Sequence, residues 1–174
     1  MSRARATYVR AMEALYVFCI GISGFAIVAI TLAVPYGVFM RYVMNSPSSW
    51  PEPFSVLMMV MFTFIGGAGV FRAKVHVAIK ALTENVGERT RGVLRNLTKA
   101  LMVVTVLFMV IWGAKLVQGM MHQTIAEFPW LPVGVAYLPI PVGGVLTLLF
   151  LIEWIWVGEL PPDSVVHSDT AAVE

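Results

Sequence analysis

Charged residues and cysteine are both scarce in this sequence. Asp, Glu, Lys and Arg make up 13% of the 174 residues, whereas about a quarter of the residues in a soluble domain are charged. The single cysteine, Cys19, lies in an apolar run, so no disulfide framework is available. This composition excludes an ordinary soluble domain, and the apolar share of 59% indicates a membrane protein.

Motifs for catalysis, metal binding and ion coupling are also missing. The three histidines lie outside the long apolar stretches, although a membrane haem needs axial histidines on facing helices. No Asp or Glu lies near the centre of such a stretch, where ion-coupled carriers usually hold their ion. The sequence lacks a phosphate-binding glycine loop, a zinc-ligand spacing and a nucleophile with a nearby base. We therefore expect no enzyme activity, no metal and no cofactor, and interpret the chain as an accessory subunit.

Four uncharged windows are present instead, at residues 14–40, 53–71, 100–114 and 128–152. A helix needs about 20 apolar residues to cross a hydrocarbon core about 30 Å thick. The third window reaches that length if Lys115 extends its ammonium to the headgroups. We predict an all-α membrane protein with spans at about 13–40, 51–72, 97–119 and 138–157. They would form a single four-helix domain over residues 1–158, followed by a disordered tail at 159–174.

The basic residues are unevenly distributed between the two ends of the predicted spans. Ten of the twelve precede the first span or lie between the second and third: Arg3, Arg5, Arg10, Arg72, Lys74, Lys80, Arg89, Arg91, Arg95 and Lys99. Because positive charge is retained in the cytoplasm during insertion, both termini and this inner loop are expected there. The basic residues thus follow topology, and they give no indication of nucleic-acid binding.

A short amphipathic helix is predicted in the inner loop. Its apolar residues fall at helical spacing, at Val75, Ile79, Leu82 and Val86. The helix would lie in the headgroup plane with its basic residues facing anionic membrane lipids. His76, near its start, has no second histidine or cysteine at metal-binding spacing, which favours a structural or interface contact over a metal ligand.

The first span is predicted to remain as an anchor and to pack closely on a neighbour. Its apolar run is about twice the length of a signal-peptide core and has no small-residue cleavage site. Small residues recur along it at steps of three or four, at Cys19, Ser23, Ala26, Ala29 and Ala33. This spacing predicts one face that another helix approaches closely.

The outer turn between the first two spans admits two interpretations. Ser49-Trp50-Pro51-Glu52 fits a capping box, which predicts a helix start between about Ser49 and Pro51. Trp50 suits the headgroup level, and Glu52 would lie beside the positive end of the helix dipole. The turn is therefore either a cap with an aromatic anchor or an exposed feature that a partner contacts.

Glycines are concentrated near the inner end of the second span, at Gly66, Gly67 and Gly69, and again at Gly143 and Gly144 in the last span. Each glycine costs a helix about 1 kcal/mol relative to alanine, so such a concentration predicts close helix contacts. The contacts could lie within the subunit or with another chain.

Two charged residues near the ends of the predicted spans, Lys115 and Glu153, are expected to have partners, and the outer loop is rich in proline. We predict that Lys115 pairs with Glu127 or Glu52, and that Glu153 snorkels or meets Arg10, Arg95 or Lys99. The outer loop contains Pro129, Pro132, Pro139 and Pro141, a density that forbids a regular helix before about Ile140.

Several of these residues, taken in order, resemble the small membrane subunit (DctQ-like) of tripartite ATP-independent periplasmic (TRAP) transporters. The matching elements are Arg41, then Trp50 and Glu52, then Phe64, Gly66, Gly67 and Ala68, then Arg72 and His76, then Pro132 and Tyr137, then Pro141 and Gly143. The resemblance covers about residues 12–158. Three positions depart from the family pattern: Pro53 replaces a second glutamate, Lys80 an aspartate and Gly134 a tryptophan.

The resemblance implies a scaffold subunit without binding sites of its own, in a bacterial inner membrane. Its partners would be a large membrane subunit, which moves an organic acid with sodium by an elevator-like motion, and a periplasmic substrate-binding protein that selects the substrate. Two alternatives stay open: the small subunit of a tricarboxylate-type tripartite transporter, and a membrane-anchor subunit of a redox complex.

Overall fold

The computed structural model describes residues 3–73 and 88–157. Four helices are long and apolar enough to cross a membrane: Tyr8–Tyr42, Pro51–Ala73, Asn96–Met120 and Val133–Ile155. The predicted fold class, an all-α membrane protein with four membrane-spanning helices, is confirmed. The amphipathic helix predicted at 75–86, together with His76 and Lys80, and the tail at 159–174 lie outside the described residues.

The first two spans form a helical hairpin. α1 (Arg3–Tyr42) runs for 40 residues with Pro35 inside it, a length of about 60 Å that exceeds the hydrocarbon thickness. α2 (Pro51–Met61) passes into a π-helical turn, η1 (Phe62–Gly66), and the helix then continues to residue 73. A π-turn widens a helix by one residue and often marks a functional site.

The last two spans form a second hairpin. α4 (Glu88–Met120) leads into two short antiparallel strands, β1 (Thr124–Ile125) and β2 (Phe128–Pro132), with a register irregularity at Thr124/Ile125. A short helix α5 (Val133–Tyr137) precedes α6 (Pro139–Val157). The expectation of no helix before about Ile140 is therefore wrong, because the stretch between Pro132 and Pro139 contains no proline.

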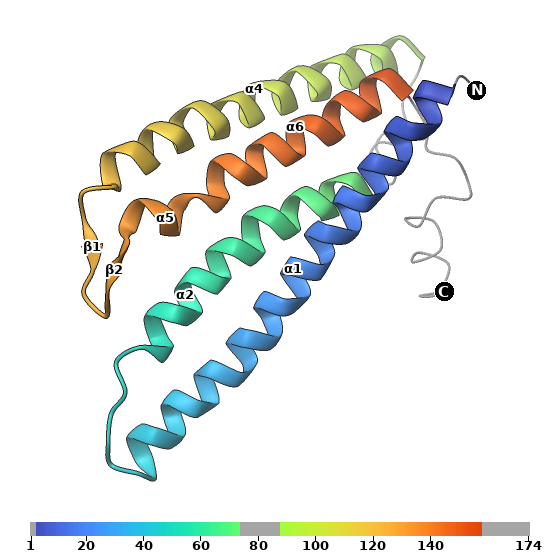
Figure 1. The fold of residues 1–174 in the computed structure, drawn as a ribbon. Coiled ribbons are helices and arrows are strands. Elements are labelled where there is room, and N and C mark those ends of the chain that lie inside the picture. Colours follow the sequence, from blue (N-terminus) through green and yellow to red (C-terminus); the bar gives the residue numbers. More distant parts are fainter. Residues whose placement is uncertain (1–2, 74–87, 158–174) are drawn as a thin grey trace.

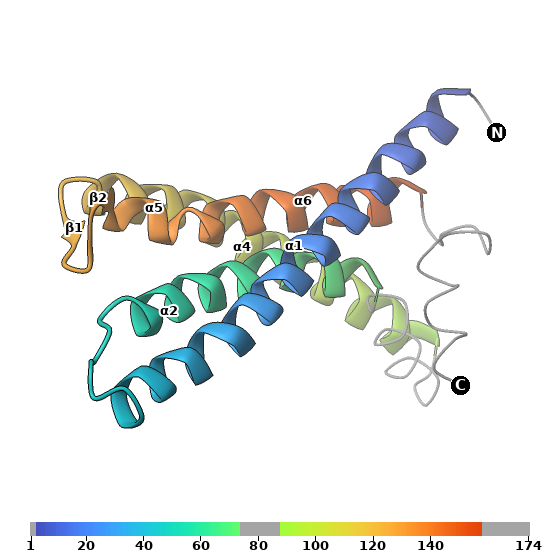
Figure 2. The same cartoon turned by 60° about the horizontal axis from the view of Figure 1, so that its bottom comes forward.

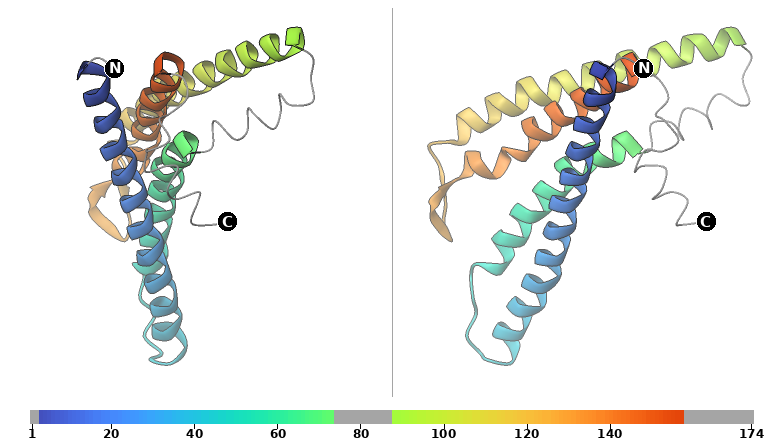
Figure 3. Two further views of the ribbon diagram at one scale, coloured as in Figure 1. Left: turned by 90° about the vertical axis from the view of Figure 1, so that its right-hand side faces the viewer. Right: turned by 45° about the vertical axis from the view of Figure 1, so that its right-hand side comes forward.

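The helices lie side by side in the order α4, α6, α2 and α1 (Figure 1). α1 contacts α2, α4 contacts α6, and η1 joins the two hairpins by contacting both α1 and α6. α1 crosses its neighbours obliquely (Figure 2), and α4 diverges from the others toward its N-terminal end (Figure 3). The N-terminal half of α1, the region of η1 and the C-terminal half of α6 enclose a core of Met12, Tyr16, Cys19, Ile65, Ala68 and Phe150.

Four of the five residues of the small-residue face predicted for α1 are buried, and the fifth, Ala29, is half-buried. Cys19 and Ala26 are fully buried, and Ser23 and Ala33 are 5% exposed. Ser23 donates its hydroxyl to the carbonyl oxygen of Cys19 at 2.7 Å, which satisfies the buried polar group inside its own helix. The face therefore lets the second span approach α1 closely, as the spacing predicted.

The capping box predicted at the start of α2 is not formed. Trp50, and not Ser49, is the N-cap residue, and it makes no side-chain capping bond. Pro51 and Pro53 lie in the first turn, where a missing N–H removes no intrahelical hydrogen bond. Prolines thus replace a side-chain cap here, because they leave fewer donors to satisfy.

Candidate functional site

A buried ion pair joins the second span to α6 near their C-terminal ends. Arg72 donates from Nε to Glu153 Oε2 at 2.9 Å and from Nη2 to Oε1 at 2.8 Å, a bidentate geometry. Arg72 is 3% exposed and Glu153 2% exposed. The prediction that Glu153 snorkels or meets Arg10, Arg95 or Lys99 is therefore wrong. Arg72 is counted above only among the basic residues that indicate topology, but it also forms a buried ion pair.

Aromatic rings enclose the guanidinium of Arg72. The rings of Tyr16 and Phe150 each have their centroid 5.6 Å from Arg72 Cζ, close enough for cation–π attraction. Arg72 Nη1 is buried and has no hydrogen-bond partner within the part of the chain that the structure describes. The pair is therefore held in a dry, mostly apolar surrounding, where loss of either charge would be costly.

The sequence contained a signal for this pair that composition alone did not convey. Arg72 and Glu153 each directly follow an uncharged window, near the C-terminal ends of two spans that run parallel (Figure 1). Equal depth in the membrane and opposite charge make them natural partners. The 81 residues between them in sequence concealed the contact.

The glycines at the inner end of the second span face different surroundings. A Cβ on Gly66 would lie 2.7 Å from Ser23 Oγ, and one on Gly69 would lie 3.2 Å from Ile20 Cδ1, so both glycines admit α1. Gly67 has nothing within 4 Å of such an atom and is exposed. Gly66 and Gly69 are therefore explained within the subunit, and Gly67 alone of the three remains available to another chain.

Gly143 performs the equivalent role in α6. A Cβ there would lie 2.6 Å from the carbonyl oxygen of Phe64, inside η1. The π-turn thus presents its backbone directly to α6, and only glycine permits this approach. Pro141, on another side of α6, contacts α4. Its Cδ lies 3.1 Å from the position that a Cβ added to Gly113 would occupy.

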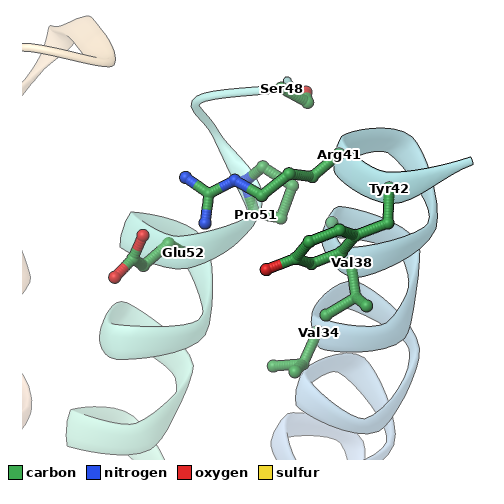
Figure 4. Close-up of a pocket in the computed structure, with 8 residues that line it drawn as sticks. Val34, Val38, Arg41, Tyr42, Ser48, Pro51 and Glu52 are labelled. Atoms are coloured by element: carbon green, nitrogen blue, oxygen red, sulfur yellow. The ribbon is translucent and has the colours of Figure 1, made fainter. Parts of the chain in front are cut away.

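A pocket on the side predicted to face outward, called the outer pocket, lies between the end of α1 and the start of α2 (Figure 4). It has a volume of about 360 Å³ and is lined by Val34, Val38, Arg41, Tyr42, Ser48 and Glu52 among others. Arg41 reaches from α1 toward the first turn of α2, where the carboxylate of Glu52 lies (Figure 4). Gly37 forms part of the wall, and a Cβ on it would lie 3.1 Å from Pro51 Cβ.

A second concavity, the outer groove, lies between α2 and α5. It also measures about 360 Å³, and its lining includes Glu52, Val56, Val60, Val133, Ala136 and Tyr137. Tyr137 is therefore brought next to the outer turn by folding. Pro132 is the N-cap residue of α5 and pairs with Thr124 in the strand ladder, so it positions that helix.

Trp50 directly precedes Pro51, which lines the outer pocket, and contacts two other aromatic rings. Its ring centroid lies 5.5 Å from that of Tyr36 and 5.9 Å from that of Phe54, which ties α1 to α2. Aromatic rings of this kind collect at the membrane–water interface.

Lys115 does not pair with an acid as predicted. Its Nζ lies 4.8 Å from the ring centroid of Trp112, one turn earlier in α4, and no ion pair joins it to Glu127 or Glu52 among the described residues. Lys99 lies in the same way over Trp154, 4.8 Å from its centroid, and so links α4 to α6. Within the described ranges, no three His, Cys, Asp or Glu side chains are grouped as a metal site would need.

Comparisons with known proteins place these features in a family. The family model described as "Tripartite ATP-independent periplasmic transporters, DctQ component" matches residues 30–158. A protein of Haemophilus influenzae, named provisionally as a TRAP transporter small permease protein, is 24% identical over 152 residues. That alignment covers 87% of this chain and 90% of the relative.

Proposed function

The chain belongs to the DctQ family of tripartite ATP-independent periplasmic transporter components, and from this premise we propose that it is the fixed scaffold on which the large membrane subunit of such a transporter works. The family match over residues 30–158 carries the proposal, because it includes three complete spans and the outer part of α1. The large subunit would move an organic acid inward with sodium, after a soluble periplasmic protein has captured it.

The exposed apolar surface supports a scaffold role. Between 17% and 22% of each spanning window is buried inside the subunit, so most of the apolar surface must be covered by lipid or by another chain. An elevator domain can slide only against a body that stays fixed in the bilayer. Two hairpins held together by η1 and by a buried ion pair supply such a body.

The proposed location is the bacterial inner membrane, with both termini in the cytoplasm. The excess of Lys and Arg before the first span and between the second and third supports this orientation. The outer pocket, the outer groove and the strands β1 and β2 would then face the periplasm, where the substrate-binding protein operates.

The test is reconstitution of transport with and without this chain. The matching binding protein is first screened against organic acids by thermal shift, and the acid that most raises its Tm becomes the labelled substrate. Proteoliposomes then receive the large subunit, the binding protein and an inward sodium gradient. We expect uptake at background level when this chain is omitted, and recovery when it is added before reconstitution.

Two controls define the result. Collapse of the sodium gradient must abolish uptake by the complete system, and co-purification must show that the large subunit is present in both preparations. Full sodium-driven uptake by the large subunit alone would refute the scaffold role.

A further inference from the structure

The outer pocket presents two opposite charges that do not neutralise each other directly. Arg41 and Glu52 line the same cavity from α1 and α2, yet no ion pair joins them among the described residues. Each charge is favoured locally, since Arg41 lies in the last turn of its helix and Glu52 in the first turn of its own. The cavity therefore offers a cation and an anion, side by side, to a ligand that carries both.

The outer groove continues from the same carboxylate into the apolar part of the molecule. Glu52, Val56 and Val60 recur at steps of four and form one stripe along α2, about 12 Å long from first to last. Val133 and Ala136 of α5 form the opposite wall. The pocket and the groove thus share Glu52, with charged groups at one end and an apolar channel leading away from them.

The depth of these features in the membrane follows from the aromatic residues around them. Tyr42 and Pro51 line the pocket, and Trp50, the residue before Pro51, lies with its ring tilted against Tyr36. Tyr and Trp collect at the headgroup level, so the charges lie among headgroups and the groove points toward the hydrocarbon. This order, charges outside and apolar channel inside, matches the order of groups in a phospholipid.

We propose that the pocket and the groove together hold one phospholipid whose headgroup carries a primary ammonium, of the phosphatidylethanolamine type. The phosphate accepts hydrogen bonds from the guanidinium of Arg41, and the ammonium donates to the carboxylate of Glu52. One acyl chain lies in the outer groove between α2 and α5. The proposal goes beyond the scaffold role and does not depend on transport, because lipid retention is measured without substrate.

The charges distinguish this lipid from other membrane lipids. Phosphatidylglycerol has no cation for Glu52, so its phosphate would lie near an unpaired carboxylate. Phosphatidylcholine has a cation, but its three methyl groups replace every N–H donor. Two volumes of about 360 Å³ each lie within the range of about 300–1,000 Å³ that is typical of small-molecule sites.

The experiment is native mass spectrometry of the full-length chain in mild detergent, alone and in complex with the large subunit. Equimolar phosphatidylethanolamine, phosphatidylglycerol and phosphatidylcholine with identical acyl chains are added. We expect one retained phosphatidylethanolamine, favoured about tenfold over the other two, the factor that corresponds to 1.4 kcal/mol. Glu52→Gln is expected to remove the preference over phosphatidylglycerol, and Arg41→Gln to lower retention of all three lipids.

Matched variants separate the site from general surface charge. Glu127→Gln and Lys115→Gln remove one outer charge of each sign away from the pocket and are expected to leave retention unchanged. Ala136→Phe fills the groove and is expected to lower retention while both pocket charges remain. If Arg41→Gln does not fold, Glu52→Gln and Ala136→Phe decide the matter.

Three outcomes would overturn the proposal. Equal retention of the three lipids would identify ordinary annular lipid. Preference for phosphatidylethanolamine that survives Glu52→Gln would place the lipid elsewhere. Loss of the retained lipid when the large subunit binds would show that a protein segment is the native occupant of the pocket.

Discussion

Arg72 and Glu153 illustrate what a single pair of residues can decide in an apolar region. Each charge loses its hydration when it is buried, and the bidentate contact between them offsets that loss. The rings of Tyr16 and Phe150 exclude water from the guanidinium. The pair therefore joins the second span to α6 in one register, because any other register would leave two buried charges unpaired.

Removal of one partner is expected to be far more damaging than removal of both. Arg72→Met or Glu153→Leu alone should destabilise the fold by about 3–5 kcal/mol, because a charge stays buried without its counter-ion. The double variant should recover to near the wild-type stability or exceed it by about 1–4 kcal/mol. Thermal unfolding of the detergent-solubilised chain gives the comparison.

Lys115→Met serves as the control for the loss of an exposed cation from a membrane-spanning helix. Its ammonium is exposed and contacts the Trp112 ring, so its replacement should change stability by less than about 1 kcal/mol. A double variant as unstable as the two single variants would mean that the pair contributes through something other than charge compensation.

At the residue scale, the sequence predicted which residues share a helix face better than it predicted which charged residues contact each other. The steps of Cys19, Ser23 and Ala26 were sufficient to predict a buried small-residue face, because helical spacing alone determines which residues share a face. The partners of Glu153 and Lys115 were not predictable in the same way. These contacts depend on how α4, α6 and the second span are placed relative to one another. Lys115 contacts the ring of Trp112 in its own helix.

At the scale of the elements, the π-turn η1 is one of the contacts that join the two hairpins, beside the Arg72–Glu153 ion pair. The carbonyl of Phe64 meets α6 at Gly143, while Gly66 meets α1 at Ser23. Thr63, within the same turn, donates its hydroxyl to the carbonyl oxygen of Met59 at 2.7 Å, which satisfies a carbonyl beside the altered helix pattern. The five residues of η1 are in close contact with α1 on one side and with α6 on the other. This explains the glycines at these contacts despite their cost to helix stability.

Gly143→Ala is expected to destabilise the subunit by about 1–3 kcal/mol, the usual cost of overpacking. The added methyl would lie 2.6 Å from a backbone oxygen, and backbone cannot move aside as a flexible side chain can. Gly67→Ala is the matched control, because its methyl meets nothing within 4 Å and alanine favours the helix. The Tm values of the two variants should therefore shift in opposite directions, and a harmless Gly143→Ala would contradict the close contact.

The sequence predicted the four membrane-spanning helices but not the strands, the short helix α5 or the π-turn. Windows without charge predicted four spans because the bilayer imposes a minimum apolar length. The strands β1 and β2 pair with each other, α5 packs mainly on α4, and the π-turn contacts α1 and α6, so these elements depend on tertiary contacts that spacing in the sequence does not reveal. Proline density argued against α5, yet the proline-free residues Val133–Tyr137 form a helix that Gly134 fits against the carbonyl of Val117.

On the scale of the whole molecule, the four helices leave wide apolar faces uncovered. α4 and α1 stand at the two ends of the order α4, α6, α2, α1 (Figure 1), so each has a side that no other described helix covers, although α1 also touches α6. Three of the four described glycines at which an added Cβ would meet nothing within 4 Å lie on different parts of this surface: Gly24 on α1, Gly67 directly after η1 and Gly119 on α4. Each can accept a larger side chain without disturbing the subunit itself, so they allow the faces to be tested separately.

Gly67→Leu is expected to weaken assembly with the large subunit, whereas Gly24→Leu and Gly119→Leu leave it intact. A leucine at an interface built around glycine forces the partner away at a cost of about 1–3 kcal/mol, roughly a 5- to 150-fold loss of affinity. The measurement is the fraction of large subunit that co-purifies with each tagged variant, with the Tm of the isolated chain as the test of folding. If Gly67→Leu assembles fully and folds normally, the glycine face is not the interface. A loss confined to Gly24→Leu or Gly119→Leu would assign the contact to α1 or α4 and leave η1 with its role inside the subunit alone.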